Sequence, residues 1–555
     1  MNKKVCSFPI LFALLALLIG TCAVVFPASA QAAPTSTGSI TVSGTVASSY
    51  DAYQIFDAHV VDGDNDAKIA TDLAWAGDAV RDVTLPVLHS AGMPNSQTSA
   101  QEAAEWLNTD SHLTSALSAR LARSLQSSGA ESMALNAGTA AELPCGYWLI
   151  VADDGAIAQG ETGTAPIMAL VGGSAVTVKP KAATPKVAKH VLENGTAAWQ
   201  KAADATVGDD LYWRLSVTVP AGLAAYDTYT VQFVDTMSAG LDPSKVATSV
   251  RVYAAAGADG GFDAVSAGKD GRAGTEPAKG WTDITAQCAT KVAADGTFTV
   301  RTGDLIAALG GADAFSAGAR VVAVYNAPLN SACNHGIAKG NPNEVYLRYP
   351  RSPFADQSGD AGFTRTPSDD ACAYTWDLAL TKRGSDGDKP LAGAVLSIAD
   401  DRGRTLAADG TWDAEGKATV TTGEDGRVTV SGVDSGKLEV RELKAPKGYT
   451  AFEGTRSVTV KAEGLDVDQV AAAKPKLTIT AESPLRADSA DGSTGSLEAS
   501  LINTPTGTPP SITTGGFMPS TGDMATYAAA AAAVAGAALI VVALLVKRGG
   551  GSHKE

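Results

Sequence analysis

The chain has 555 residues, too long for one hydrophobic core, so its length predicts about three domains. Its formal net charge is −16 and its aromatic content is 6%. These values argue against a nucleic acid partner, because binding phosphate requires a basic face.

The first residues have the layout of a secretory signal peptide. Lys3 and Lys4 precede an apolar run from Phe8 to Phe26, and Ala28-Ser29-Ala30 follows it. This order predicts a signal peptide over residues 1–30, with an uncleaved membrane anchor as the alternative. We therefore expect the mature chain to be exported.

The exported part has the sequence pattern of a mainly β protein. Alternating stretches at residues 39–43 and 427–430 predict half-buried strands, and Gly/Asp-rich segments between such stretches predict turns. One Ala- and Leu-rich stretch, residues 99–125, predicts a helical insertion in the N-terminal part.

Four cysteines remain after the signal peptide: Cys145, Cys288, Cys333 and Cys372. Outside the cell they could pair in several ways, and the sequence does not choose between these pairings and buried free thiols. The chain has no CxxC motif and no Cys/His cluster with zinc spacing, so we expect no metal and no cofactor.

The first module, residues 31–181, ends at Val178-Lys179-Pro180-Lys181. This end resembles the VYPK segment of the pilin motif in Spa-type shaft pilins, with Lys179 in place of Tyr. In that family the lysine after the proline receives the threonyl acyl group of the next subunit. The resemblance implies Lys181 as the polymerisation lysine, with Lys179 and Lys186 as rivals and a solvated basic linker as the alternative.

The second module, residues 182–370, resembles the isopeptide-forming fimbrial domain. The resemblance rests on four segments, residues 185–191, 207–213, 233–237 and 340–347. It implies Lys189 as the reacting lysine, Asp235 as the catalytic acid and Asn343 as the reacting asparagine, with Asn341 as a rival to Asn343.

The third module, residues 371–505, resembles a Cna B-type, prealbumin-like repeat. The segments that carry this resemblance are residues 378–382, 391–394, the E-box at 442–449 and the closing strand at 501–504. It implies a second triad of Lys382, Glu442 and Asn503. The two resemblances together imply tandem Ig-like or Cna-type β-sandwiches.

Both triads have a physical logic. A lysine buried among apolar strands loses hydration, so its pKa falls and the neutral amine can attack the asparagine carboxamide. A buried carboxyl with a raised pKa can hydrogen-bond that carbonyl and carry protons as ammonia leaves. The alternative is that both lysines are exposed strand residues and both asparagines form turns.

The C-terminus combines three segments. A Ser/Thr/Pro/Gly-rich linker at 506–517 leads to the pentapeptide Met518, Pro519, Ser520, Thr521 and Gly522, and an apolar stretch at 524–546 precedes Lys547-Arg548. The stretch is long enough to cross a bilayer, with the basic tail inside the cell. The pentapeptide resembles an LPxTG sorting signal, which implies that a sortase attacks Thr521, releases Gly522 and the residues after it, and passes the acyl group to an amine.

The sequence thus predicts a structural shaft subunit of a covalent pilus on a Gram-positive cell surface, anchored in the cell wall. The implied partners are sortase, neighbouring pilin subunits and peptidoglycan. A singly anchored adhesin or minor pilin that binds a host surface ligand is the alternative. An enzyme is not expected, because the chain has no GxSxG, HExxH or complete P-loop motif.

Overall fold

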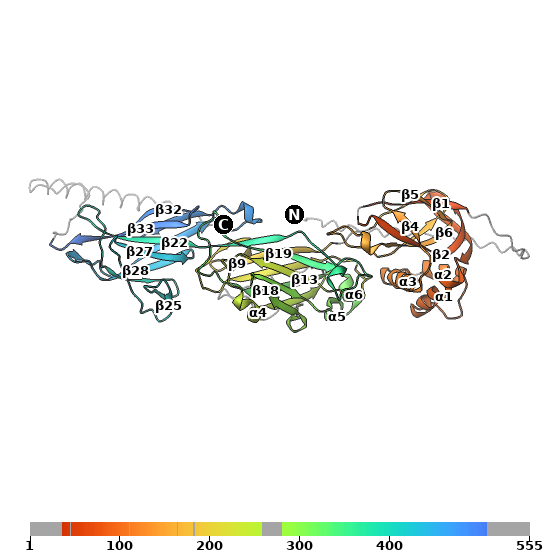
Figure 1. Cartoon of the computed structure of the whole chain (residues 1–555), viewed down its shortest axis with the longest axis horizontal. Helices are drawn as coiled ribbons and strands as arrows, with labels where there is room; N and C mark the ends of the chain where they lie inside the picture. Colours follow the sequence, from red (N-terminus) through yellow and green to blue (C-terminus); the bar gives the residue numbers. More distant parts are fainter. Residues whose placement is uncertain are drawn as a thin grey trace, which may run out of the picture.

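The computed structural model describes residues 36–507, apart from 45, 110, 164, 181–183, 222 and 258–279. Three sets of packed sheets follow one another along the chain. Figure 1 shows them in a row along the long axis, with the N-terminal set at the right and the C-terminal set at the left. The predicted mainly β chain of tandem modules is confirmed. The predicted signal peptide and sorting signal lie outside the described residues.

The first module packs two sheets and three helices. Its strands are β1 (Thr37–Val42), β2 (Ser49–Asp62), β3 (Lys68–Trp75), β4 (Met133–Asn136), β5 (Ala140–Pro144), β6 (Gly146–Ala152), β7 (Ile167–Val171) and β8 (Val176–Val178). One sheet has the order β5-β1-β8 and the other β3-β2-β6-β7, with β4 beside β2. Successive side chains of β6 point to opposite faces. Trp148 and Ile150 therefore pack against the small sheet, and Leu149 and Val151 pack against the helices.

The helical insertion consists of three helices, α1 (Asp78–Ser90), α2 (Ala100–Asn108) and α3 (Ser115–Ser128). The single helical stretch predicted at 99–125 is divided in two because Thr114 starts a new helix, its side chain accepting from the Leu117 N–H. Ser99 and Glu102 form a capping box at the start of α2. We did not predict α1, whose β-branched residues and internal Pro86 lower its intrinsic helix propensity.

The second module is a sandwich of two larger sheets. Its strands are β9 (Lys186–Glu193), β10 (Ala198–Gln200), β11 (Ala202–Asp204), β12 (Tyr212–Val219), β13 (Gln232–Met237), β14 (Arg251–Ala256), β15 (Thr282–Asp283), β16 (Ala289–Val292), β17 (Thr297–Arg301), β18 (Ala319–Asn326), β19 (Asn341–Pro350), β20 (Phe363–Arg365) and β21 (Asp369–Tyr374). The sheets have the orders β10-β9-β12-β18-β14-β15 and β11-β21-β19-β13-β17-β16, with β20 beside β19. Short helices lie at α4 (Val246–Ser249), α5 (Leu305–Ala308) and α6 (Ala312–Ser316).

The third module is a smaller sandwich. Its strands are β22 (Trp376–Gly384), β23 (Val395–Ala399), β24 (Thr405–Leu406), β25 (Trp412–Asp413), β26 (Val420–Thr421), β27 (Arg427–Val433), β28 (Gly436–Lys444), β29 (Tyr449–Thr450), β30 (Thr455–Glu463), β31 (Lys476–Ala481), β32 (Leu485–Asp491) and β33 (Ser496–Pro505). One sheet has the order β27-β22-β33-β29 with β32 beside β33, and the other the order β25-β24-β23-β28-β30-β31 with β26 beside β23.

Hydrogen bonds join the modules to one another. The Tyr349 hydroxyl of the second module donates to the Gly160 carbonyl of the first (2.7 Å), and the Gly163 N–H donates to the Arg351 carbonyl (2.7 Å). Between the second and third modules the chain passes from β21 to β22 through Thr375 alone. Because β21 belongs to a sheet of the second module, that module reaches slightly beyond its predicted end at residue 370.

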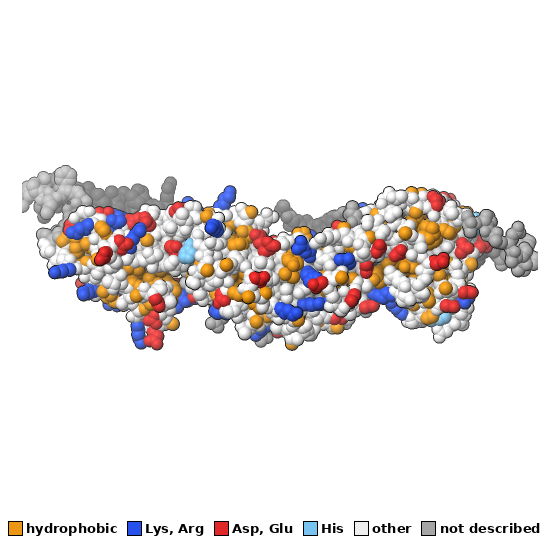
Figure 2. All heavy atoms as spheres, in the orientation of Figure 1, with side chains coloured by type: hydrophobic (Ala, Val, Ile, Leu, Met, Phe, Trp, Pro, Cys, Tyr) orange, Lys and Arg blue, Asp and Glu red, His pale blue; other side chains and the backbone are white. Residues whose placement is uncertain are grey.

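The surface carries both signs of charge along its length. Figure 2 shows acidic and basic side chains interspersed over all three modules on the face in view. Within residues 36–507, as far as the structure describes them, no helix is both long and apolar enough to cross a membrane. The predicted span at 524–546 lies beyond these residues.

Candidate functional site

The first predicted triad lies in the centre of the second sandwich. Lys189 on β9 comes from one sheet, and Asp235 on β13 and Asn343 on β19 come from the other. All three side chains are fully buried, at 0% exposure. Lys189 alternates along β9 with the core residue Val191, and this alternation directs its stem between the sheets.

The polar atoms of this triad meet in one hydrogen-bonded group. The Lys189 ammonium pairs with Oδ2 of Asp235 and also contacts the hydroxyl of Tyr325 on β18 at 2.9 Å. The Tyr325 hydroxyl lies 3.0 Å from the same Asp235 oxygen and 2.8 Å from the Asn343 amide nitrogen. Among the described residues, the second oxygen of Asp235 and the carbonyl oxygen of Asn343 have no hydrogen-bond partner. The group therefore has open acceptor positions beside an amine and an amide.

Burial changes the protonation of this group. It lowers the pKa of Lys189 to about 8, although Asp235 opposes the shift, and it raises the pKa of Asp235. The rings of Trp213 and Tyr325 lie 5.5 Å and 5.4 Å from the ammonium nitrogen. These shifts favour a neutral amine beside a neutral acid, the state in which an amine can act as a nucleophile.

The rival asparagine, Asn341, is committed elsewhere. Its side-chain oxygen accepts from the Asn334 N–H at 2.8 Å, and its amide nitrogen donates to the Asn334 carbonyl at 2.9 Å and the Ala373 carbonyl at 3.2 Å. The structure therefore places Asn343, and not Asn341, in the hydrogen-bonded group of Lys189.

The second predicted triad lies in the core of the third module. Lys382 on β22 is 1% exposed, Asn503 on β33 is 2% exposed and the side chain of Glu442 on β28 is fully buried. The Asn503 amide nitrogen donates to both Glu442 oxygens, at 2.9 and 3.0 Å, and the Lys382 ammonium lies 3.6 Å from one of them. Burial lowers the pKa of Lys382 to about 8. The Asn503 carbonyl oxygen has no hydrogen-bond partner in the described part of the chain.

The two triads differ in the strands that they would join. Lys382 and Asn503 lie on neighbouring parallel strands, the first and the last of their module. Lys189 and Asn343 lie on opposite sheets, and Asn343 is not on the last strand, because β20 and β21 follow β19. The pair in the second module therefore does not join the first and last strands of its module. A bond there would instead connect the two layers of the sandwich.

Sequence reasoning missed Tyr325. It belongs to β18, in which every residue is buried and most are apolar, so its ring reads as part of the core. Trp213, its partner on the neighbouring strand β12, faces the same site, but this pairing does not indicate a role for the Tyr325 hydroxyl. Asp235 lies on a strand of the opposite sheet, so it becomes adjacent to Tyr325 only when the two sheets pack against each other.

The residues predicted to join subunits lie mostly outside the described part. Lys181 and the sorting pentapeptide, Met518 to Gly522, are among them. Among the described neighbours of Lys181, Val178 ends β8, Lys179 and Lys186 are exposed, and Pro180 and Pro185 are buried. Lys179 and Lys186 therefore remain available as alternative acceptors.

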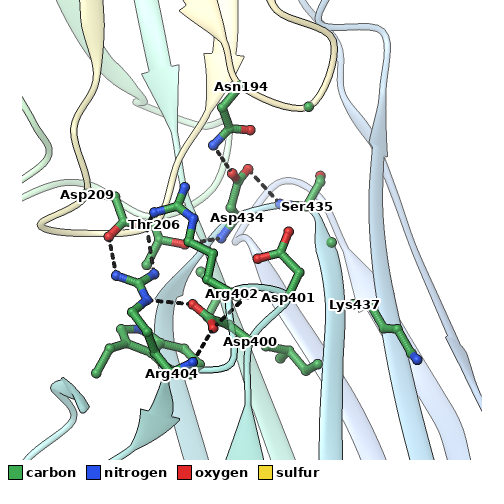
Figure 3. Close-up of a pocket in the computed structure, with 15 residues that line it drawn as sticks. Asn194, Thr206, Asp209, Asp400, Asp401, Arg402, Arg404, Asp434, Ser435 and Lys437 are labelled. Atoms are coloured by element: carbon green, nitrogen blue, oxygen red, sulfur yellow. Dashed lines mark hydrogen bonds and ion pairs between the residues drawn. The ribbon is translucent and has the colours of Figure 1, made fainter. Parts of the chain in front are cut away.

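A cavity of about 300 Å³ lies between the second and third modules, and charged pairs line it. Figure 3 shows Arg402 and Arg404, from the β23–β24 loop, turned toward Asp209 of the second module. Asp209 accepts from both terminal nitrogens of Arg404, at 2.5 and 2.8 Å, and from Arg402 at 2.9 Å. Asp400 accepts from the Arg404 Nε at 2.7 Å. These pairs hold the junction together.

An acidic cluster lies at the same junction. Glu193, Asp204 and Asp434 have carboxylate oxygens within 4.8 Å of one another, close enough to hold a metal ion. Asp204 already accepts from the Trp376 indole at 2.6 Å and from the Ser435 N–H at 3.0 Å. Burial, reinforced by Asp204, raises the pKa of Glu193 to about 8 and that of Asp434 well above its usual range. The cluster therefore keeps protons near neutral pH.

Cys145, Cys288, Cys333 and Cys372 are free thiols, so the structure contains no disulfide among the described residues. Burial raises the pKa of Cys288, Cys333 and Cys372 to about 11 in each case. These thiols are therefore protonated near neutral pH and poorly nucleophilic.

Comparison with known proteins supports the reading of the third module. Residues 377–474 match the SpaA family, described as a prealbumin-like fold domain. Over 143 residues the chain is 30% identical to the trypsin-resistant surface T6 protein of Streptococcus pyogenes serotype M6, and the alignment covers 24% of each chain. The chain thus aligns with about a quarter of that relative's length. The resemblance to Spa-type pilins predicted from the sequence is confirmed by these matches.

Solved structures show the same kind of similarity over a longer part of the chain. The T6 backbone pilin of Streptococcus pyogenes matches with a TM-score of 0.45 and 16% identity, covering 86% of this chain and all of that one. The major pilin SpaD of Corynebacterium diphtheriae matches with a TM-score of 0.40 and 15% identity, covering 85% and 98%.

Proposed function

We propose that this chain is a shaft subunit of a sortase-assembled pilus whose modules close themselves with lysine–asparagine isopeptide bonds. The observation that carries the proposal is the repeated burial of a lysine, a carboxyl group and an asparagine in one hydrogen-bonded group, in two successive modules. Burying two lysines and lowering their pKa destabilises the folded state, so we expect the buried amines to take part in a reaction.

The reaction in each module needs no outside enzyme. The neutral lysine amine attacks the asparagine side-chain carbon, and the new amide forms as the asparagine nitrogen leaves as ammonia. Asp235 and Glu442 carry the protons, because each contacts the lysine of its own triad. Unfolding then no longer extends the chain between the joined residues, which favours resistance to tension and proteolysis.

Assembly of subunits uses the two ends of the chain. A sortase cleaves after Thr521 and transfers its acyl group to Lys181 of a neighbouring subunit, or to peptidoglycan at the base of the filament. The T6 relative is described as a trypsin-resistant surface protein. The same location and the same resistance are expected of this chain.

Intact mass measurement of the secreted ectodomain, residues 31–517, tests the internal bonds. Each bond releases one ammonia, so the wild type is expected to be lighter than its sequence by two such losses of about 17 Da. Asp235→Asn and Glu442→Gln are each expected to abolish one of these two mass losses and to keep the other. A wild type with the full sequence mass would end the self-crosslinking proposal.

Wall extracts of the producing cells, boiled in detergent, test the assembly. We expect a ladder of high-mass species that disappears in Lys181→Ala and persists in Lys186→Ala, a matched change at an exposed lysine a few residues away. A ladder unaffected by Lys181→Ala would reject that acceptor. A single band in the wild type would favour the singly anchored adhesin that binds a host ligand.

A further inference from the structure

The Tyr325 hydroxyl occupies the centre of the second-module site. It contacts the Lys189 ammonium at 2.9 Å, Asp235 at 3.0 Å and the Asn343 amide nitrogen at 2.8 Å. A hydroxyl can donate one hydrogen bond and accept two. Donation to Asp235 and acceptance from Lys189 and Asn343 use this capacity fully, so the three contacts are mutually compatible.

The position of this hydroxyl separates the acid from the nitrogen that must leave. In the part of the chain that the structure describes, the Asn343 amide nitrogen hydrogen-bonds to Tyr325 and not to Asp235. The third module is arranged differently, because both Glu442 oxygens accept directly from the Asn503 amide nitrogen. A proton can therefore pass directly from acid to amide in the third module, whereas in the second it must cross the tyrosine.

We propose that Tyr325 is a catalytic residue of the second module that relays a proton between Asp235 and the departing nitrogen of Asn343. The inference rests on the proposed self-crosslinking. Asp235 takes a proton from the Lys189 ammonium, and the free amine adds to the Asn343 side-chain carbon. Tyr325 then gives its proton to the amide nitrogen and takes one from Asp235. The carbon–nitrogen bond of the amide breaks, ammonia leaves, and the lysine nitrogen returns its surplus proton to Asp235.

The surroundings of Tyr325 suit this role. Its ring packs edge-on against Phe298, with centroids 4.6 Å apart, and it is fully buried beside Trp213 in the strand register. This packing holds the hydroxyl in position, so little entropy is lost in orienting it for proton transfer. Burial raises the pKa of Tyr325 well above its usual range, so the phenol keeps its proton at neutral pH.

The test compares Tyr325→Phe with Tyr229→Phe in the full ectodomain. Tyr229 is a matched control, because it is fully buried in the same core and its hydroxyl has no hydrogen-bond partner among the residues that the structure describes. Protein from a short synthesis pulse is quenched in denaturant at timed intervals, digested, and assayed by mass spectrometry for the linked peptide pairs. The pair Lys382–Asn503 serves as an internal reference in every sample.

A positioned proton donor contributes about 10²–10⁴-fold to a rate, so Tyr325→Phe is expected to slow the Lys189–Asn343 linkage by at least ~100-fold. The control, and the third-module linkage in both variants, are expected to keep the wild-type rate. Equal rates of Lys189–Asn343 linkage in the two variants would overturn the role of Tyr325 and leave the self-crosslinking proposal intact. A wild type without that linked pair would overturn self-crosslinking in the second module, and the relay with it.

A folding measurement separates catalysis from packing. Asp235→Asn provides a reference for a second module that lacks the bond. Tyr325→Phe protein taken before its linkage has formed is expected to unfold at the same temperature as this reference, which supports loss of the reaction alone. If Tyr325→Phe is unfolded while Asp235→Asn is folded, the hydroxyl is a packing element and the catalytic role fails.

Discussion

Replacing Glu442 by glutamine is expected to lengthen the path of the chain under tension by several hundred ångström. Lys382 and Asn503 lie on adjacent parallel strands, so a bond between them bypasses nearly the whole third module. The bypassed loop has about 120 residues, and at ~3.4 Å per extended residue it holds ~400 Å of chain. The substitution keeps the size of the side chain while it removes the acid that contacts both reacting groups.

The whole tether can be estimated in the same way. With handles at position 181 and after residue 507, the two bonds leave about 50 residues free to extend, or at most ~180 Å. Without any bond about 330 residues extend, or ~1,100 Å. The corresponding Asp235→Asn variant releases the loop between Lys189 and Asn343, about 150 residues or ~500 Å.

Single-molecule pulling of the ectodomain measures these lengths directly. We expect the wild type to extend by less than ~200 Å before the tether breaks, and Glu442→Gln to add one discrete step of ~400 Å, less the length that the folded module already spans. A wild type that extends to ~1,100 Å would refute both bonds. Equal extension of Glu442→Gln and the wild type would show that the bond forms without the acid.

Three further predictions concern stability. Asn503→Ala cannot form the third-module bond, so its Lys382 remains a free amine with a pKa of about 8 in the folded state and 10.5 in the unfolded state. Between these pH values the unfolded state binds more protons, so the melting temperature should rise with pH. A second change, Lys382→Met, should remove this rise. At the junction Glu193 has a pKa of about 8 against its ordinary 4.5, so the folded state holds a proton that the unfolded state has lost. Stability of the wild type should therefore fall as pH rises from 5 toward about 8, and Glu193→Gln should flatten that slope in thermal unfolding curves. Asp209→Ala removes the carboxylate that accepts two hydrogen bonds from Arg404. Urea unfolding should then show a free energy of unfolding lower by about 1–3 kcal/mol, and solution scattering should show greater bending between the modules.

The third-module triad was predictable because local motifs fix its strands. Lys382 follows an alternating apolar run, Glu442 begins the E-box, and Asn503 lies near the end of the closing strand, so each residue could be placed without its neighbours in space. In the second module Asn341 and Asn343 share one face of β19, because alternate residues of a strand point the same way. The contacts of Asn341 with Asn334 and with the Ala373 carbonyl decide between them.

Contacts made by distant strands were beyond sequence reasoning. Tyr325 has the burial pattern of an ordinary core residue, and its hydroxyl acquires a role only when β13 and β19 close over β18. Glu193, Asp204 and Asp434 come from two modules and meet at their junction, so no spacing in the sequence indicates their shared protons. Side chains of this kind are determined by how sheets pack and not by local propensity.

The two proposed bonds leave the segment between Asn343 and Lys382 in the path of tension. Within this segment the chain runs out along β19, turns, and returns along β21, so Asn343 lies opposite Ala371 and pulling would open the pair of strands one hydrogen bond at a time. What resists this opening is the pairing of β21 with β11 and of β19 with β13 on their outer sides. Two further contacts strengthen this junction between the modules. The Trp376 indole donates a hydrogen bond to Asp204 at the end of β11, and Arg404 forms an ion pair with Asp209. The polar network at the junction therefore stabilises the stretch of chain that neither bond protects.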